Sequence, residues 1–264
     1  MSSSEWDKWK DEIHEKVSAT IGECRVAKEL FGRVYEDVAE SDIGFVWRKG
    51  GEDTVETSPT GDRVTTLATP TLKWVDIAPI VVKASGDYRT WFEDRESYSI
   101  DPMLEEIGRR VSTMEITKLI GDLVGEAHEV KVDGNVLTKA DMISAAASIR
   151  SHKHFPNTMV ANPKEVQELL NKNEAVQKWG LPESLWSSKG RSLVGFVDGI
   201  DIHWVAEAPS GTYLLYDKGE VVARMGKVET YFEDRLATSL VVRHRCIAWA
   251  FDADALTRIC LRQA

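Results

Sequence analysis

The residues best suited to chemistry are two histidines on either side of a lysine, in the run His152-Lys153-His154. Two imidazoles at this spacing can share a metal ion when a third ligand joins them. Nothing in the sequence singles out that third ligand. We therefore interpret the run as the solvated end of a helix, with a hydrolase or metal enzyme that uses His152, His154 and nearby acids as the alternative.

The other polar motifs have structural interpretations. His203 and His244 lie in strand patterns, where a hydrogen-bonded structural histidine is the usual finding. Asp252 and Asp254, like the run Asp133-Gly134-Asn135, resemble fragments of calcium loops but lack the remaining ligands. These acids are better interpreted as turn residues.

Two acidic runs, Glu93-Asp94-Arg95-Glu96 and Glu233-Asp234-Arg235, place carboxylates next to one another. Adjacent strand residues point to opposite faces, and each run has an arginine to pair with its acids, so neither makes an acid/base pair. Glycine loops for phosphate, the nucleophile elbow and the zinc-protease helix are missing, and Gly226-Lys227 lacks the flanking residues of a phosphate loop. We therefore predict no catalytic residue, no cofactor-binding residue and no metal ligand.

The cysteines and tryptophans also favour structural roles. Cys24, Cys246 and Cys260 are odd in number and have no metal-type spacing, which favours a reducing compartment. Cys246 lies in a strand pattern and is predicted to be inert core. The nine tryptophans are more typical of core or interface anchors than of a platform for stacking bases.

Composition narrows the class of protein further. The chain has 264 residues, of which 42% are hydrophobic, and a formal net charge of -10 at pH 7. No basic block is present, so a surface that grips nucleic acid is disfavoured, although enclosing nucleic acid without gripping it stays open. No apolar run is long enough to span a membrane, and the N-terminal residues are too charged for a signal peptide.

The first predicted element is an amphipathic helix capped by Ser4. Its apolar positions recur with helical period and are Trp6, Trp9, Ile13, Val17, Ile21, Cys24 and Phe31. Such an arm most often packs on its own domain, and docking on a neighbouring subunit is the alternative.

The segment from Ile43 to Lys83 is predicted to form strands between turns at Gly50-Gly51 and Ser58-Pro59-Thr60-Gly61-Asp62. The strand residues from Val64 to Trp74 carry little continuous apolar surface. A two-stranded excursion of this kind is marginal in water unless something packs on it. Either the rest of the domain or another subunit must cover it.

Asp101-Pro102 is predicted to cap and open a helix of about 24 residues, roughly twice the usual length. Its predicted apolar stripe consists of Leu104, Ile107, Val111, Met114, Leu119 and Leu123. Thr138 and Asp141 predict a capping box for a helix through Ile149, and Asn162-Pro163 predicts another that ends near Asn173.

The remaining segments are predicted to be strands. Leu193 to Val197, an Asp198-Gly199 turn and Ile200 to Trp204 predict a hairpin. The further predicted strands are Thr212 to Tyr216 after a Pro209-Ser210-Gly211 turn, Val221 to Met225 after an Asp217-Lys218-Gly219 turn, Val228 to Phe232, Ser239 to Ala250, and Leu256 to Leu261.

This order of segments resembles that of the Hong Kong 97-type major capsid proteins of tailed viruses and the related encapsulin shell proteins. The segment that ends in KWVDIAPIVVK resembles the extended loop of that family, and Pro102 to Val124 resembles its long spine helix. TMVANPKEVQELL and GFVDGIDIHWVAEAPSGTYLLYD resemble parts of the axial domain, and GKVETYFEDRLATSLVVRHRCIAWAFDADAL resembles the closing peripheral strands.

The resemblance implies an α+β subunit with five parts. These are an N-terminal arm over residues 1–41, an extended loop over 42–83, a peripheral domain with the spine helix over 84–137, an axial domain over 138–225, and return strands of the peripheral domain over 226–264. It also implies that many copies close into an icosahedral shell of pentamers and hexamers, in which each extended loop lies over a neighbour.

Two departures from the family pattern refine this expectation. One branch joins its subunits by a Lys–Asn isopeptide bond, but the last asparagine here is Asn173, so we expect a noncovalent shell. A disulfide through Cys246 or Cys260 is disfavoured by their strand context. The arm before Ile43 is too short for a built-in scaffold, so a separate scaffold, prior cleavage or scaffold-free assembly is expected.

The first functional hypothesis is a viral major capsid protein that encloses double-stranded DNA without sequence-specific binding, since an acidic container can hold and later release a genome. It would be located in the virion, would assemble in the host cytoplasm, and would have portal, scaffold or cement proteins as partners, with no membrane. The alternative is an encapsulin that encloses an enzyme cargo. A monomeric adaptor is a third hypothesis.

Overall fold

The computed structural model describes residues 3–50, 54–57, 63–66, 69–95, 99–134, 136–172, 192–233 and 237–262. Its helices are α1 (Ser3–Cys24), α2 (Ala27–Leu30), α3 (Tyr88–Glu93), α4 (Asp101–Glu126), α5 (Lys139–Ser151) and α6 (Pro163–Lys172), with short 3-10 turns η1 (Lys218–Glu220) and η2 (Ala253–Ala255). Helices and strands are mixed along the chain, so the predicted α+β class is confirmed.

Five groups of paired strands are described. The strands are β1 (Arg33–Val38), β2 (Phe45–Arg48), β3 (Thr54–Thr57), β4 (Arg63–Thr66), β5 (Thr71–Trp74), β6 (Ile80–Ser85), β7 (His128–Asp133), β8 (Thr158–Ala161), β9 (Leu193–Val197), β10 (Ile200–Trp204), β11 (Thr212–Tyr216), β12 (Val221–Gly226), β13 (Glu229–Phe232), β14 (Ser239–His244), β15 (Cys246–Ala250) and β16 (Leu256–Arg262).

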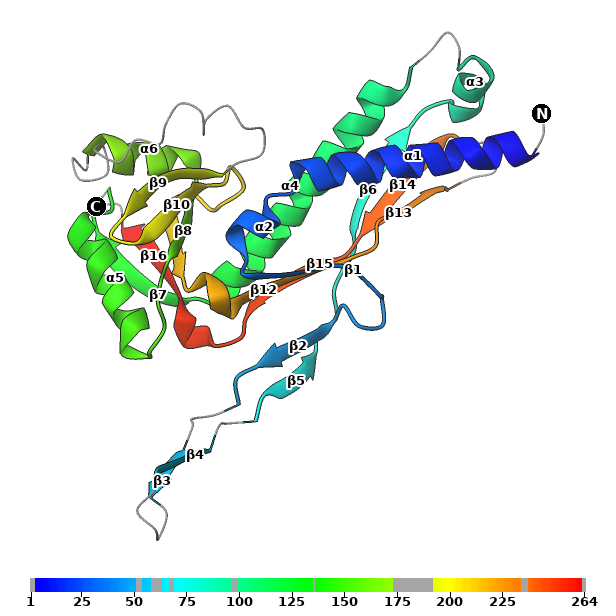
Figure 1. Ribbon diagram of the computed structural model, residues 1–264. Coiled ribbons are helices and arrows are strands. Elements are labelled where there is room, and N and C mark those ends of the chain that lie inside the picture. The colour runs from blue at the N-terminus through cyan, green and yellow to red at the C-terminus, as the bar shows by residue number, and fades with distance from the viewer. Residues whose placement is uncertain are drawn as a thin grey trace.

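A six-stranded sheet in the order β7-β16-β11-β8-β10-β9 forms one end of the molecule, where Figure 1 shows α5 and α6 beside it. All four residues of β8 are buried. Apolar side chains of α5, α6 and the sheet share one core, which includes Met142, Ile149, Val166 and Tyr213. One face of the sheet therefore has a hydrophobic core of its own, whereas Val160, Leu214 and Tyr216 belong to the cluster around α4.

The local signals in this half of the chain were predicted correctly. Thr138 and Asp141 form a capping box at the start of α5, and the Asn162 Oδ1 atom accepts a hydrogen bond from the Lys164 N–H at the start of α6. Asp198 and Gly199 both have positive φ, of 50° and 86°, as a two-residue type I′ hairpin turn requires. Residue 173, where α6 was predicted to end, lies outside the described residues.

The 26-residue helix α4 runs along the rest of the subunit beside α1 (Figure 1). The prediction that Asp101 is its N-cap was wrong. Ile100 occupies that position without a side-chain hydrogen bond, and Asp101 is the first helical residue. Its carboxylate instead forms an ion pair with Lys16 of α1, with 2.7 Å between Nζ and Oδ1.

The N-terminal helix packs on its own chain, as expected for the commoner of the two predicted outcomes. Trp9, Ile13, Val17 and Ile21 are buried against the first half of α4. The predicted stripe of apolar residues does not continue to Phe31 on one helix, because the chain leaves α1 at Arg25 and Val26 before α2 begins. Phe31 is buried in a second cluster around the later half of α4.

The long predicted strand from Ser239 to Ala250 is in fact two strands in two sheets. β14 pairs with β13 and β6, whereas β15 pairs with β12 in a sheet with β1. Arg245 separates them, and its carbonyl accepts a hydrogen bond from the Gly226 N–H. Arg243, His244 and Arg245 interrupt the apolar residues at this point, so the sequence carries a local sign of the break that the prediction of one strand did not use.

The excursion predicted between residues 43 and 83 projects from the body of the subunit (Figure 1). β2 pairs with β5 and β3 pairs with β4, both antiparallel. The turn at Ser58-Pro59-Thr60-Gly61-Asp62, and Gly51 of the earlier turn, lie outside the described residues. Ile43, Val46 and Ile77 at its root are buried in one cluster, whereas residues 80–83 belong to β6, which pairs with β14 in the body of the subunit, with Ile80 buried in another cluster.

The division into five parts stays a prediction. The pairing of strands in the six-stranded sheet crosses the predicted boundaries between the peripheral and axial domains. β7 and β16 come from the two segments assigned to the peripheral domain, yet both belong to the six-stranded sheet. Within the described part of the chain, no helix is both long and apolar enough to cross a membrane.

The close approach of α1 and α4 provides a test of this packing. A Cβ added at Gly108 of α4 would lie 2.7 Å from Thr20 Cβ of α1, whereas one at Gly121 of the same helix would meet no atom within 4 Å. Gly121→Ala is therefore expected to raise the free energy of unfolding by about 1 kcal/mol through helix propensity. Gly108→Ala is expected to lower it by about 1–3 kcal/mol through overpacking.

Urea denaturation of the unassembled chain measures both values. Equal stabilisation by the two substitutions would contradict the close contact between these helices.

Candidate assembly surface

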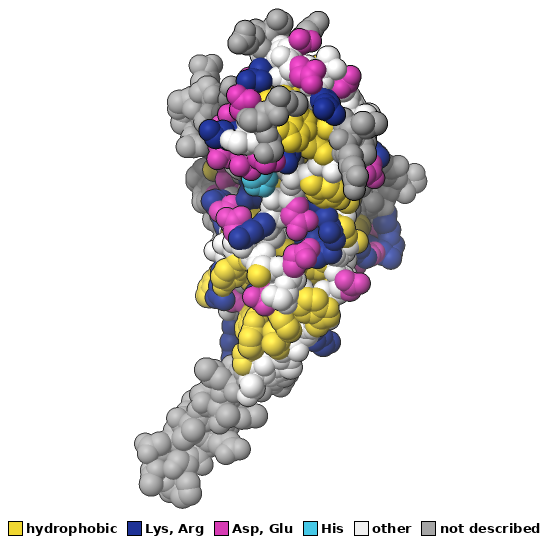
Figure 2. Space-filling view, turned by 90° about the vertical axis from the view of Figure 1, so that its right-hand side faces the viewer, with side chains coloured by type: hydrophobic (Ala, Val, Ile, Leu, Met, Phe, Trp, Pro, Cys, Tyr) yellow, Lys and Arg dark blue, Asp and Glu magenta, His cyan; other side chains and the backbone are white. Residues whose placement is uncertain are grey.

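The ribbon of β2 and β5 has one apolar face that is exposed. Phe45 is opposite Trp74 and Trp47 is opposite Leu72, so these four side chains lie on the same face. Trp47, Leu72 and Trp74 are 46%, 47% and 53% exposed. The Phe45 and Trp74 rings meet edge to face, with 4.8 Å between their centroids. Figure 2 shows hydrophobic side chains gathered on this part of the surface.

The opposite face anchors the ribbon to the body of the subunit. Val46 is buried in a cluster with Ile77 and Trp249. The Trp249 Nε1–H donates to the Trp47 carbonyl at 2.8 Å, and the Arg48 guanidinium pairs with Glu126 at the end of α4. The root of the ribbon is thus fixed while its apolar face points away.

A groove of about 330 Å³ lies beside the apolar face, lined by Tyr35, Phe45, Trp47, Leu72 and Arg224 among others. The Arg224 guanidinium lies 5.7 Å from the centroid of the Tyr35 ring and donates through Nη1 to the Asp42 carbonyl at 2.8 Å. Burial lowers the pKa of Arg224 from its ordinary value, although nearby Tyr35 and Asp42 act in the opposite direction. The groove is apolar with one fixed cation at its floor.

This arrangement suits binding rather than chemistry. A two-stranded ribbon is marginal alone in water, and a contiguous exposed apolar surface of this kind marks an interaction site. Two half-exposed tryptophans lie at its centre, and tryptophan is among the residue types that contribute most of the binding energy at protein interfaces.

A buried carboxylate, Glu115, lies at the centre of the subunit. Its side chain is 2% exposed and accepts two hydrogen bonds from Arg25, Nε to Oε1 and Nη2 to Oε2, both 2.9 Å long. His244 Nε2 lies 2.8 Å from Glu115 Oε2, within ion-pair distance but without the alignment of a hydrogen bond. Burial alone would raise the pKa of Glu115, but the contacts with His244 and Arg25 outweigh it, and the pKa is lowered.

Sequence analysis did not find this charge cluster. The predicted apolar stripe of α4 contained Met114, which is 42% exposed, while Glu115 takes the buried place beside it. Arg25 and His244 are distant from Glu115 along the chain. The one available signal was the position of Glu115 four residues after Val111, on the buried side of the helix.

His152 and His154, the candidate metal ligands, do not converge. His152 Nδ1 lies 3.1 Å from the Ser148 carbonyl, whereas His154 Nε2 lies 3.0 Å from Asp252 Oδ2. Asp252 also pairs with Lys49 at 2.8 Å. No group of three or more metal-ligating side chains that could hold an ion occurs in the described ranges.

His203 and Asp252 have the predicted structural roles, whereas the hydrogen bond predicted for the His244 ring is not found among the described residues. His203 Nδ1 lies 2.8 Å from Ser192 Oγ, whose hydroxyl donates to Glu29 at 3.0 Å. Desolvation lowers the pKa of His203 to about 4, so the ring is neutral at pH 7. Asp252 caps the turn η2 by accepting from the Asp254 N–H. The hydrogen-bonded structural role predicted for His203 and the turn predicted at Asp252 are confirmed.

The predicted pairing of Arg95 with the acids of its own run is not found among the described residues, since Arg95 Nη1 donates to the Phe92 carbonyl at 3.1 Å. Glu93 pairs with Arg89, 3.8 Å apart, and Glu233 pairs with Lys83. Residues 96, 135, 234 and 235 of the predicted motifs lie outside the described residues.

The cysteine and tryptophan predictions are confirmed in part. Cys246 is buried, and desolvation raises the pKa of its thiol. Cys24, Cys246 and Cys260 all carry free thiols. Trp249 is fully buried and Trp9 nearly so, whereas Trp47 and Trp74 form the exposed ribbon face. Trp179 and Trp186 lie outside the described residues.

Comparisons with solved structures find similar folds at low sequence identity. A virus-like particle protein from Pyrococcus furiosus has a TM-score of 0.64 and 10% identity, with 94% of this chain and 98% of that chain covered. The SrpI encapsulin of Synechococcus elongatus PCC 7942 has a TM-score of 0.57 and 16% identity, with 89% and 86% covered. A Mycobacterium phage Bobi protein has a TM-score of 0.55 and 13% identity, with 91% of each chain covered. No protein-family model and no curated protein matches the chain.

The Glu115 cluster generates a prediction about stability. Glu115→Gln is expected to lower the free energy of unfolding by about 1–3 kcal/mol, because it removes the buried one of the two carboxylates that pair with Arg25 and leaves only Glu36 as its charged partner. Glu105→Gln, on the same helix, removes only an exposed pair with Arg109 and is expected to cost at most about 0.5 kcal/mol. Urea denaturation near neutral pH measures both, and similar losses would show that the buried pair adds nothing.

The same cluster predicts a dependence on pH. Because the pKa of Glu115 in the folded chain is below its ordinary value of 4.5, its contribution is complete above that value and is lost as pH falls through the folded pKa. The stability difference between the wild type and Glu115→Gln should therefore shrink on acidification from about pH 7 to about pH 3. Denaturation curves across this range measure it, and a constant difference would contradict the assignment.

Proposed function

Because the chain has the Hong Kong 97-type fold of capsid and encapsulin shell proteins, we propose that it is a structural subunit that assembles with copies of itself into a closed icosahedral shell. The observation that carries this proposal is the exposed apolar face of the β2–β5 ribbon. Its root is fixed to the subunit by Val46 and Arg48, while Trp47 and Trp74 on the other face are left for a neighbour.

A neighbouring copy suits this face for energetic reasons. A buried tryptophan removes about 150–250 Å² of surface from water. At about 25 cal/mol per Å², covering the exposed half of one such ring stabilises a contact by roughly 2–3 kcal/mol. The same face recurs on every copy, so the gain is repeated at each contact of a symmetric shell.

The finer proposal is a viral capsid that encloses double-stranded DNA. Support comes from the similarity to a phage protein and from the net charge of -10, which suits a container that does not grip its contents. In this proposal the shell is built from pentamers and hexamers, is located in the virion and assembles in the host cytoplasm. Portal, scaffold or cement proteins are its partners.

The alternative is an encapsulin shell that encloses an enzyme cargo, which the similarity to the SrpI encapsulin supports. The contents of purified particles distinguish the two. Nuclease-resistant DNA with portal or tail proteins would support the virus, and one specific enzyme inside the particles would support the encapsulin.

We propose a structural role without catalysis, cofactor or metal. The candidate histidines His152 and His154 have separate partners, and the acids around them serve as turn and ion-pair residues. If His152→Ala and His154→Ala together abolished binding of a metal present in the purified protein, a metal enzyme would replace this proposal.

Assembly is tested on the expressed chain by size-exclusion chromatography and negative-stain microscopy. We expect hollow particles from the wild type. Replacing both Trp47 and Trp74 with Ser should raise the concentration needed for assembly at least about tenfold, since about 1.4 kcal/mol per contact corresponds to that factor.

Lys73→Ser is the matched control, because it shortens an exposed side chain of the same strand on the opposite face of the ribbon. It should leave assembly unchanged. A wild-type chain that stays monomeric at high concentration, or a double variant that assembles normally, would contradict the role given to this face.

A further inference from the structure

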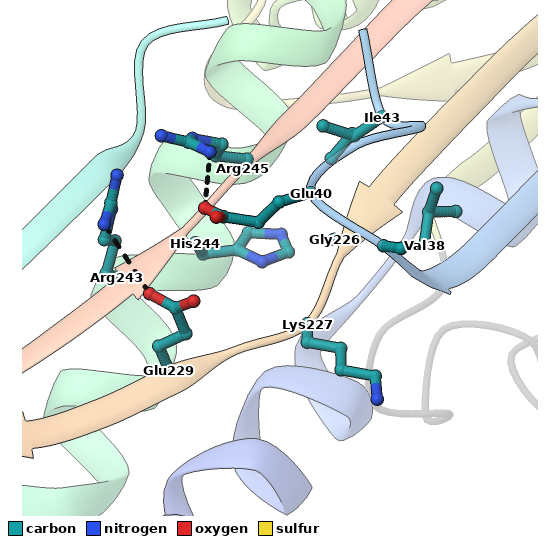
Figure 3. Close-up of a pocket in the computed structure, with 10 residues that line it drawn as sticks. Val38, Glu40, Ile43, Gly226, Lys227, Glu229, Arg243, His244 and Arg245 are labelled. Carbon is teal, nitrogen blue, oxygen red and sulfur yellow. Dashed lines mark hydrogen bonds and ion pairs between the residues drawn. The ribbon is translucent and has the colours of Figure 1, made fainter. Parts of the chain in front are cut away.

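A small cavity lies where the extended ribbon joins the subunit. Its volume is about 90 Å³, and its walls come from the end of β1, the loop before β2, the end of β12 and the junction of β14 and β15. Figure 3 shows the His244 ring extending from its strand toward Gly226, with the Glu40 and Arg245 side chains nearby. The cavity therefore touches the same histidine that faces Glu115.

Two buried nitrogens on the cavity wall have no hydrogen-bond partner among the described residues. They are Nδ1 of His244, a fully buried side chain, and Nε of Arg245. The Arg245 guanidinium uses Nη1 for its pair with Glu40, which leaves Nε available. Unsatisfied buried polar groups are costly, so two on one cavity wall indicate a missing partner.

The charges around the cavity favour an anionic partner. Its walls carry the cations Lys227, Arg243 and Arg245 against the carboxylates Glu40 and Glu229. Arg245 pairs with Glu40 and Arg243 lies 3.8 Å from Glu229, while Lys227 has no ion pair within the part of the chain that the structure describes. Lys227 is exposed, and Figure 3 shows its side chain extending away from His244, so the positive charge nearest the unsatisfied nitrogens is that of the Arg245 guanidinium itself.

The rest of the lining is apolar and consists of Val38, Ala39, Ile43 and Gly226. Such a surface suits a short aliphatic stem, which a phosphate or sulfate ion lacks. We propose that this cavity binds a carboxylate on a short aliphatic stem, with His244 Nδ1 and Arg245 Nε as its hydrogen-bond donors. When the carboxylate binds, the His244 ring lies between two carboxylates, that of the ligand and that of Glu115.

Water is the competing occupant. At about 30 Å³ per molecule, the cavity has room for about three waters, which would also satisfy the two nitrogens. Water does not use the positive charge of the Arg245 guanidinium, however, and it gains nothing from the apolar wall. A saturable response to a carboxylate, with none to chloride, separates the two.

A carboxylate of this chemistry has two sources. It is either a free small carboxylate or the side chain of an Asp or Glu from a second copy of this chain. Only the second source depends on the proposed shell. Binding of a free carboxylate by the unassembled chain tests the cavity whether or not the chain forms shells.

The experiment is calorimetric titration of the unassembled full chain with sodium propionate, with sodium chloride at equal ionic strength as the reference. We expect saturable binding with a dissociation constant of about 1 mM, typical of so small a ligand. Gly226→Ala places a methyl group 3.1 Å from Ile43 Cδ1 at the cavity wall, and Arg245→Lys removes the Nε donor. Each should weaken binding at least about tenfold.

Gly121→Ala, on an open part of α4, is the control and should bind propionate as the wild type does. Circular dichroism confirms that each variant is folded. An absence of saturable binding in the wild type, or equal binding in Gly226→Ala, would overturn the proposal and leave a cavity filled by water only.

Assembled particles identify the source. Loss of propionate binding on assembly would show that a side chain of a second copy fills the cavity. Retained binding in particles would identify a free carboxylate as its ligand.

Discussion

The buried carboxylate of Glu115 is the interaction on which the arrangement of this subunit depends. A charge with 2% exposure must be paired, and its partners come from the link between α1 and α2 and from the end of β14. The cluster therefore holds two distant parts of the chain at one point on α4. Further along the same helix, Asp122 and Glu126 accept hydrogen bonds from the Ala248 and Ala250 N–H groups of β15, at 3.1 Å each. The long helix thus organises the subunit through its acids as much as through its apolar stripe.

Much of the fold could be predicted from the sequence because its signals are local. The capping box at Thr138 and the Asp198-Gly199 turn depend on a few adjacent residues. The failures concern choices made by distant contacts. Asp101 was a good N-cap by type, but Lys16 of another helix binds its carboxylate. The polar residues Arg243, His244 and Arg245 separate two apolar runs, but only the pairing of β14 and β15 with different strands shows that the chain changes sheet there.

For the candidate assembly surface, the sequence predicted that a cover is needed but not which face needs it. The need for a cover over residues 43–83 followed from the weakness of an isolated two-stranded ribbon. Which face needs that cover depends on the register, because only the pairing of Phe45 with Trp74 places the aromatic residues of both strands together. The burial of Val46 then decides which face is fixed and which is free. The Glu115 cluster was not predictable, since Arg25, Glu115 and His244 share no local pattern.

The position of β16 has a consequence for the order in which the chain can fold. β16 lies between β7 and β11, and these two strands do not pair with each other. A nascent chain that has not yet reached residues 256–262 therefore cannot complete the six-stranded sheet, although β7 to β11 have already been made. The apolar ribbon is synthesised much earlier. During synthesis the exposed apolar face of the ribbon is therefore present before the body that carries it is complete, which is the condition under which incompletely folded chains aggregate.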